Sequence, residues 1–230
     1  MTKALLVLAA TLAFVTGSYV VSFSGFAPDQ FPVPQIDPPV QPAGYAFAIW
    51  GVLFLWLIAS AVFGVMRRAG DPAWDAVRPA LIVSVGVGAA WNAVANASPV
   101  AATVLIWVML VAAILALSKA PAADRPWLAW PIGLYAGWLT AASCVALGLL
   151  ATGYGFVGAE AAAIGAIIAA AILAGSVVRA TANPAYAVAV IWALVALVVK
   201  NGADVIIASA AAVGAIVALA VLTVTSSRRA

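Results

Sequence analysis

The sequence has no histidine, a single cysteine and few charged residues, which make up only 7% of the chain. Histidine is the commonest metal ligand and general base and a frequent haem ligand, so its absence argues against most enzymes and metalloproteins. The lone Cys144 lies in an apolar run and cannot form a disulfide within the chain. The net charge of +3 is small and dispersed, which argues against nucleic-acid binding.

Hydrophobic residues take the place of charge and make up 67% of the sequence. A soluble domain has about a quarter of its residues charged. A helix of about 20 apolar residues crosses a bilayer, and an isolated strand leaves its backbone groups unsatisfied in lipid. The alternating pattern of an outer-membrane barrel is absent. The sequence therefore predicts an all-α integral membrane protein.

The apolar runs predict a bundle of eight transmembrane helices. The first run resembles a secretory signal, because Lys3 precedes it and small residues follow near Gly17. Its apolar character continues through Phe23, so we interpret it as a helix. The predicted spans are residues 4–23, 44–66, 79–97, 99–118, 128–151, 157–178, 184–200 and 203–224.

The positions of the basic residues predict the orientation, because Lys and Arg concentrate in cytoplasmic loops. Eight spans place nine of the ten basic residues on the side of both termini, and only Lys200 on the other. The nine are Lys3, Arg67, Arg68, Arg78, Lys119, Arg125, Arg179, Arg228 and Arg229. We expect a multi-pass protein of the bacterial cytoplasmic membrane with both termini in the cytoplasm. Lys200 is close enough in sequence to Asp204 to pair with it.

The most informative stretch runs from Pro42 to Phe54. Phe47, Trp50 and Phe54 share one helix face, where they either fill gaps between helices and touch lipid or line a pocket. The preceding residues 24–43 contain six prolines and two phenylalanines, which favour a stiff, extended chain. This segment is either a lid over a cavity or a spacer that wraps the helix ends.

Polar and small residues mark other helices. Asn92 is the most deeply placed amide, and an interhelical hydrogen bond is favoured there over a ligand contact. Tyr135 and Trp138 lie near mid-bilayer, and the small residues that follow leave room for another helix or a ligand. Spans six and eight have small residues four apart and are predicted to pack through them: Ala161, Gly165, Ala169, Ala210, Gly214 and Ala218.

Together these patterns resemble the TspO/MBR family of tryptophan-rich sensory proteins, in a longer form. The resemblance covers spans one to five and rests on residues 42–54, Trp91-Asn92 and residues 138–143. Ala146 and Ala95 depart from the family, which usually has asparagine and an aromatic residue there. The resemblance implies a five-helix core in residues 1–152 and a three-helix C-terminal extension of the same membrane domain in residues 153–230.

The resemblance also implies a function. It indicates a binding or sensory protein, regulatory rather than catalytic, for a flat hydrophobic ligand such as a porphyrin or another tetrapyrrole. It establishes no cofactor beyond such a bound ligand. The predicted orientation independently places Trp50 and Trp91 beneath the proline-rich segment. The candidate ligand-binding residues are Tyr45, Phe47, Trp50, Phe54, Trp91, Asn92, Tyr135, Trp138 and Ala142.

Three other functions are open at this stage. A small secondary transporter is compatible with eight spans, although broken helices and buried mid-membrane charges are not evident. A structural subunit of a larger membrane complex would use the smooth faces of spans six and eight. An enzyme is disfavoured because no paired carboxylates lie in a span and Cys144 has no visible activating partner. The expected partners are the bilayer, a hydrophobic small molecule and a second copy or a membrane complex.

Overall fold

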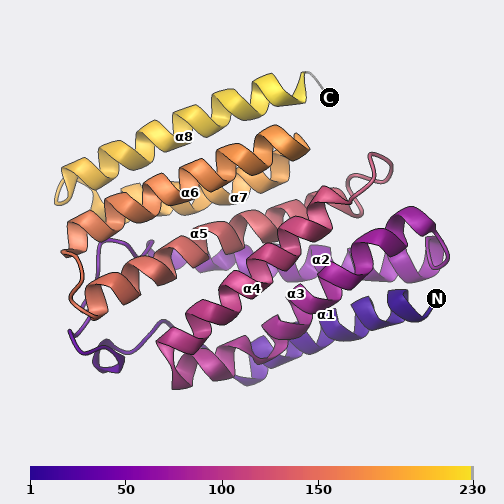
Figure 1. Cartoon of the computed structure of the whole chain (residues 1–230), viewed down its shortest axis with the longest axis horizontal. Helices are drawn as coiled ribbons and strands as arrows, with labels where there is room; N and C mark the ends of the chain where they lie inside the picture. The colour runs from indigo at the N-terminus through magenta and orange to yellow at the C-terminus, as the bar shows by residue number, and fades with distance from the viewer. Residues whose placement is uncertain (229–230) are drawn as a thin grey trace.

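The computed structural model describes residues 1–228, and all its regular elements are helical (Figure 1). Eight helices are long and apolar enough to cross a membrane, which confirms the predicted all-α fold and number of spans. They are α1 (Thr2–Val20), α2 (Ile49–Arg67), α3 (Pro72–Ala97), α4 (Pro99–Ser118), α5 (Ala129–Gly153), α6 (Ala159–Thr181), α7 (Pro184–Asn201) and α8 (Ile206–Ser227). Short 3-10 turns, η1 (Pro28–Gln30) and η2 (Gly44–Ala48), precede α2.

Three helices begin with a capping side chain followed by proline at the first helical position. Asp71 accepts hydrogen bonds from the backbone N–H groups of Ala73 and Trp74, and Ser98 and Asn183 cap α4 and α7 in the same way. The cap at Asp71 starts α3 at Pro72 rather than at the predicted residue 79. Pro79 is accommodated inside the helix, so the prediction for this start was wrong.

Helix α5 occupies the centre of the bundle and packs against α2, α4, α6 and α7. In the membrane span of α5, 72% of the residues are buried, whereas in that of α8 only 17% are buried. Helices α1 and α3 pair on one side, and α8 lies outermost against α6 and α7 (Figure 1). Of the C-terminal helices, α6 and α7 therefore cover α5 directly and share its core.

The small residues of spans six and eight do not pack as predicted. Gly165 and Gly214 are exposed and meet no other residue, and the alanines four residues away from each are exposed as well. The close approach occurs between α5 and α7 instead, where a side chain at Gly137 would collide with the carbonyl of Tyr186. Below it, the Tyr186 and Thr140 hydroxyls lie 2.5 Å apart. The prediction was wrong because residue size alone does not indicate which helix face is covered.

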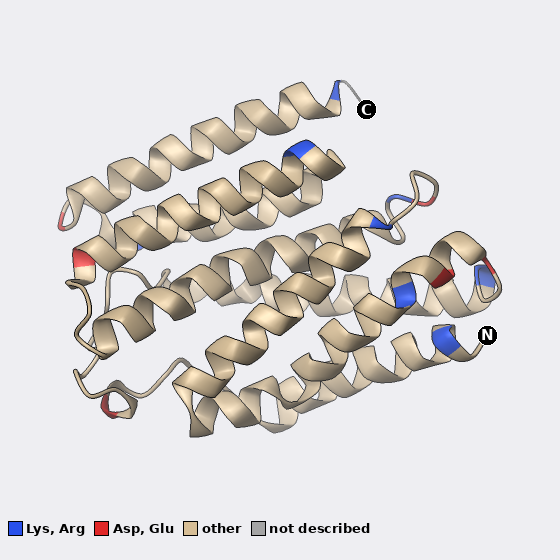
Figure 2. Cartoon of the chain, in the orientation of Figure 1, with Lys and Arg blue, Asp and Glu red and all other residues tan. Residues whose placement is uncertain are grey.

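Charged residues lie at the two ends of the bundle, and most of the basic ones lie at the end with both termini (Figure 2). We call this the terminus end and the opposite one the loop end. At the loop end Lys200 pairs with Asp37 of the proline-rich segment and not with Asp204. Sequence proximity suggested Asp204, but the segment brings Asp37 across the end of α7. Arg229, which contributes to the predicted orientation, lies outside the described residues.

A buried arginine closes the terminus end. Arg78 of α3 is 3% exposed and donates hydrogen bonds to the backbone carbonyls of Gly64, Arg68 and Ala69, at 3.3, 2.7 and 3.1 Å. Gly64 lies in the last turn of α2 and Arg68 and Ala69 directly follow that helix, where a helix leaves its last acceptors unsatisfied. Arg78 also pairs with Asp75. The arginine thus caps α2 from a neighbouring helix.

A second cluster ties the loop after α4 to α2 and α3. The Arg68 Nε donates to Asp124 at 2.7 Å, and the Trp74 indole N–H lies 3.3 Å from the same carboxylate. The hydrogen bond from Arg68 lowers the pKa of Asp124, although partial burial opposes this shift. Asp124 therefore stays ionised at neutral pH and holds the two loops of this end together.

Candidate ligand cavity

A cavity of about 850 Å³ opens beneath the proline-rich segment at the loop end. Small-molecule sites typically have volumes of about 300–1,000 Å³, so this one falls in that range. Its walls come from α1, α2, α3, α4 and α5, and Phe23, Phe26, Gln41 and Pro42 cover it from the connecting segment. The segment therefore lies over a hollow, as the lid interpretation expects. We call this space the main cavity.

The structure brings seven of the nine candidate residues to the main cavity: Phe47, Trp50, Phe54, Trp91, Asn92, Trp138 and Ala142. They come from η2, α2, α3 and α5. The tryptophans Trp50, Trp91 and Trp138 stand on three different helices, and their rings line one space. The convergence expected from the predicted orientation is therefore present in the fold.

Aromatic rings form a continuous wall on one side of this cavity. Trp50 stacks on Phe54 with ring centroids 5.0 Å apart, and its ring meets Trp138 edge-on at 6.2 Å. Phe14 of α1 meets Trp50 edge-on at 5.7 Å, and Phe47 meets Trp138 edge-on at 5.7 Å. Edge-to-face and offset stacked pairs are the favoured aromatic arrangements. The rings hold one another in position.

The three indole N–H groups differ in their partners. The Trp91 Nε1 donates to the carbonyl of Ala102 in α4 at 2.9 Å. Among the described residues, the indole nitrogens of Trp50 and Trp138 have no hydrogen-bond acceptor, and both residues line the main cavity. The N–H of Trp91 is therefore used within the fold, whereas those of Trp50 and Trp138 are not.

Asn92 has a structural role at the edge of the cavity. Its Nδ2 donates to the carbonyls of Val21 and Ser18, at 2.7 and 3.4 Å. These carbonyls lie at the C-terminal end of α1, which the side chain therefore caps from α3. The interhelical hydrogen bond favoured by the sequence is observed, so the amide nitrogen of Asn92 is already engaged with the backbone of α1 and the residue after it.

Tyr45 and Tyr135 do not line the main cavity. Tyr45 lies in the 3-10 turn η2 and is 44% exposed, with its ring edge-on to Trp192 of α7 at 5.5 Å. Tyr135 is fully buried in α5, and its hydroxyl lies 3.1 Å from the Ser84 Oγ. Phe14 contacts Tyr135 and lines the cavity in its place. Tyr45 lies two residues before Phe47 and therefore points to a different side, and Tyr135 lies farther from the loop end along α5 than Trp138 does.

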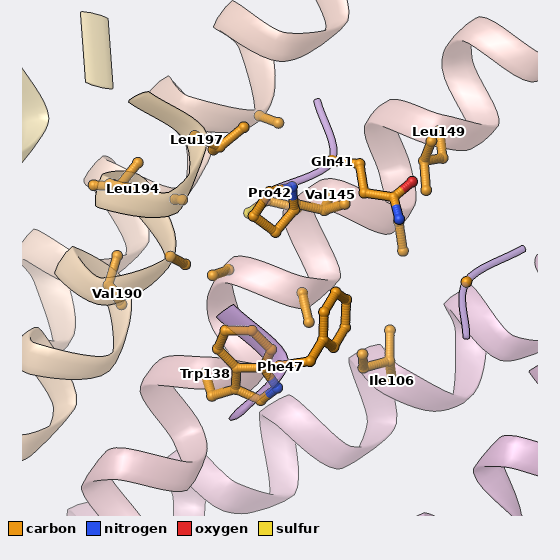
Figure 3. Close-up of a pocket in the computed structure, with 18 of the residues that line it drawn as sticks. Gln41, Pro42, Phe47, Ile106, Trp138, Val145, Leu149, Val190, Leu194 and Leu197 are labelled. Carbon is orange, nitrogen blue, oxygen red and sulfur yellow. The ribbon is translucent and has the colours of Figure 1, made fainter. Parts of the chain in front are cut away.

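A second, narrow space of about 90 Å³ continues from the main cavity between α5, α6 and α7 (Figure 3). We call it the side chamber. Figure 3 shows Phe47 and Trp138 side by side at this space, with Val190, Leu194 and Leu197 of α7 along another side. The two spaces share nine lining residues, Phe47 and Trp138 among them.

Sequence reasoning missed the contributions of α1, α6 and α7 to these spaces. Phe14, Ala170 and Leu194 follow ordinary apolar periodicity, which core residues and pocket residues share. The run of small residues after Trp138 was the only available signal, because it indicated room for a helix or a ligand. In the fold it leaves room for both.

The proline-rich segment is fastened to α5 and α7 at several points. The Thr152 hydroxyl donates to Gln35 at 2.7 Å, and the Asn201 Nδ2 donates to the carbonyl of Pro39 at 2.9 Å. Phe31 is 4% exposed and packs where Gly153 leaves space for its ring. The cover of the cavity is therefore fastened in part to the C-terminal half of the chain.

The polar chemistry of the site is sparse. No group of three or more Cys, Asp or Glu side chains in the described part of the chain is placed to hold a metal ion. Gln35, Gln41, Asp37 and Lys200 supply polar side chains at the segment that covers the cavity. The remaining walls are mainly aromatic and aliphatic, which suits binding of an apolar molecule.

The comparisons with known proteins give one match. The family described as TSPO-like protein matches residues 4–224, a range that reaches from α1 into α8. No curated protein and no solved structure matches the chain.

Proposed function

Because the chain belongs to the TSPO-like family, we propose that it binds a flat hydrophobic ligand, such as a porphyrin or another tetrapyrrole, within the membrane. The observation that carries this proposal is the convergence of Trp50, Trp91 and Trp138 on one covered cavity. We propose a sensory or regulatory role rather than a catalytic one. The cytoplasmic membrane of a bacterium, with both termini in the cytoplasm, is the location that the charge distribution favours.

The geometry suits a ring system with a few polar groups. Ring faces of a ligand can stack on Trp50 and Trp138, whose N–H groups are free to donate to a carboxylate or a ring nitrogen. Polar substituents can reach Gln41 and Lys200 beneath the covering segment. A ligand of this kind can stack on the aromatic rings and also form hydrogen bonds with the few polar groups.

Titration of the purified protein in lipid nanodiscs with protoporphyrin IX tests the proposal. We expect saturable quenching of tryptophan fluorescence in the wild type. Trp50→Ala should weaken binding roughly tenfold, because a stacked ring and its buried area are lost. Trp127→Ala is the matched control, since Trp127 is an exposed tryptophan in the Arg68–Asp124 region of the terminus end and lines neither space.

Two results would contradict the proposal. One is quenching that rises linearly with porphyrin concentration, as partition into lipid produces. The other is an equal dissociation constant for Trp50→Ala and Trp127→Ala, since a site bounded by Trp50 cannot be indifferent to its loss.

A further inference from the structure

The side chamber is a narrow apolar extension of the site that the aromatic wall does not explain. We propose that it binds the hydrocarbon tail of a ligand whose ring lies in the main cavity. The ligand class is then a flat ring system that carries a long aliphatic chain of isoprenoid or acyl type. This inference rests on the proposed function, because the main cavity must hold the ring.

The lining of the chamber selects hydrocarbon. Beyond the residues that it shares with the main cavity, its walls are Gly25 and side chains of α5, α6 and α7, of which the Cys144 thiol is the only polar group. Gln41 lines both spaces and therefore lies where they meet. A charged or hydrogen-bonding group in the chamber would lose its water without gaining partners. A ring with carboxylates thus fits the main cavity, and only an aliphatic chain fits beyond it.

The size of the chamber also matches a chain. Its volume is about 90 Å³, which is room for only a few groups of the size of a water molecule, whose share of liquid volume is about 30 Å³. The main cavity measures about 850 Å³. The side chamber is therefore too small for a second ring system, but it admits a short segment of aliphatic chain.

Alanines keep this chamber open within an otherwise close interface. Ala146, Ala166, Ala170 and Ala193 line it and are buried. On the same face of the bundle, Gly137 lets α5 approach the Tyr186 backbone of α7 so closely that no side chain fits between them. Protein interiors rarely leave voids larger than a water molecule. Helices α5 and α7 are therefore in close contact at Gly137, while the side chamber between α5, α6 and α7 stays unfilled.

A chain-length series tests the inference with monoesters of protoporphyrin IX bearing methyl, butyl, octyl and dodecyl chains, titrated in nanodiscs. With dissociation constants referred to the ester concentration in water, corrected by partition into protein-free nanodiscs, each methylene that enters the chamber should lower the dissociation constant by up to about fourfold. The gain should stop at the chain length that fills the space, within the methyl-to-dodecyl series. Partition into lipid does not produce such a limit.

Two alanines of α6 provide matched variants. Ala170→Leu fills the chamber and should remove the dependence on chain length while changing the affinity for the methyl ester less than about threefold. Ala169→Leu places the same side chain on the neighbouring exposed position and should keep the wild-type series. A chain-length gain that is the same in both variants would overturn the inference.

The outcomes separate the inference from the proposed function. Saturable, Trp50-dependent binding of the methyl ester with no gain from longer chains overturns the tail site and leaves ring binding intact. Failure of every ester to bind saturably overturns both.

Photo-crosslinking of the wild type does not depend on how the variants fold. A diazirine at the end of the octyl chain should label Ala166, Ala170, Val190 or Leu194, which line the chamber. Label confined to the exposed Ile172, Val188 and Val195 would overturn the inference, since these residues face away from it.

Discussion

The two ends of the bundle differ in how they use polar groups. At the terminus end, Arg78 and the Arg68–Asp124 pair fill the space between helices with hydrogen bonds. At the loop end, the space between helices stays hollow and aromatic, and the polar contacts lie in the segment that covers it. One end is thus built for rigidity, and the other leaves volume for another molecule.

Helix α3 belongs to both ends and shows how they are related. Its Arg78 caps the C-terminal end of α2, and its Asn92 caps the C-terminal end of α1. In a membrane, unsatisfied carbonyls at a helix end are costly. With both neighbours fixed by α3, the cavity between α1, α2 and α5 is kept open by helices that cannot easily close on it.

Loss of the Arg78 side chain should have the largest effect on stability. Arg78→Ala removes the donor to three backbone carbonyls and leaves Asp75 unpaired, and we expect a loss of about 3–5 kcal/mol. Thermal unfolding in detergent, followed by circular dichroism, measures it. Arg67→Ala is the control, because Arg67 is exposed at the same end. Equal melting temperatures for the two variants would contradict the role of Arg78.

Filling the hollow end should change stability in the opposite direction. Ala142→Leu places a side chain in the main cavity and should stabilise the free protein by about 0.5–2 kcal/mol. The same variant should lose porphyrin binding. Ala136→Leu, six residues earlier on α5 at a fully buried position, should destabilise by about 1–3 kcal/mol through overpacking. If both variants destabilise equally, the main cavity is not an empty space in the folded protein.

Acid should weaken the terminus end through Asp124. Because its pKa is lower in the folded protein than in the unfolded chain, Asp124 stabilises the fold at pH values above the unfolded value of about 3.9. That contribution is lost as the pH falls from there through the folded pKa. Melting temperatures between pH 6 and pH 3 should fall less steeply in Asp124→Asn than in the wild type. Parallel curves would contradict this assignment.

The pair at the loop end should contribute least. Lys200 and Asp37 are 24% and 76% exposed at their side chains, and such pairs are worth about 0.2–1 kcal/mol. Lys200→Ala should therefore leave the melting temperature nearly unchanged but raise hydrogen exchange in residues 33–43. A loss of stability as large as that of Arg78→Ala would show that polar contacts contribute equally to stability at the two ends.

The sequence predicted the number of helices because hydropathy and the placement of charge report directly on the bilayer. It also placed Trp50 and Trp91 together beneath the proline-rich segment, because the depth of each follows from the orientation. It did not predict the start of α3 at Pro72 or the outward faces of Gly165 and Gly214. Both features depend on which neighbouring helix or loop packs against a given face. The sequence of a single helix does not contain that information.

The position of Tyr45 illustrates the same limit in the site. Tyr45 lies two residues before Phe47 and five before Trp50, so helical spacing turns it away from the face that those rings share. In the fold its ring meets Trp192 edge-on, and the sequence of one helix could not predict that α7 covers this face. The side chamber was missed for a related reason, since Leu194 and Ala170 have the pattern of core residues. Pocket and core residues differ only in whether the opposing atoms are present.

The bond between α7 and η2 has a consequence for dissection of the chain. The Trp192 Nε1 donates to the carbonyl of Ala46 at 2.9 Å, and the backbone N–H of Ala43 donates to the carbonyl of Ala196 at 3.2 Å. A truncated fragment that stops after α5 would lose both anchors at the threshold of the aromatic wall, together with Asn201 beneath the proline-rich segment. The minimal unit that keeps these anchors of η2 and the proline-rich segment is therefore the chain through α7.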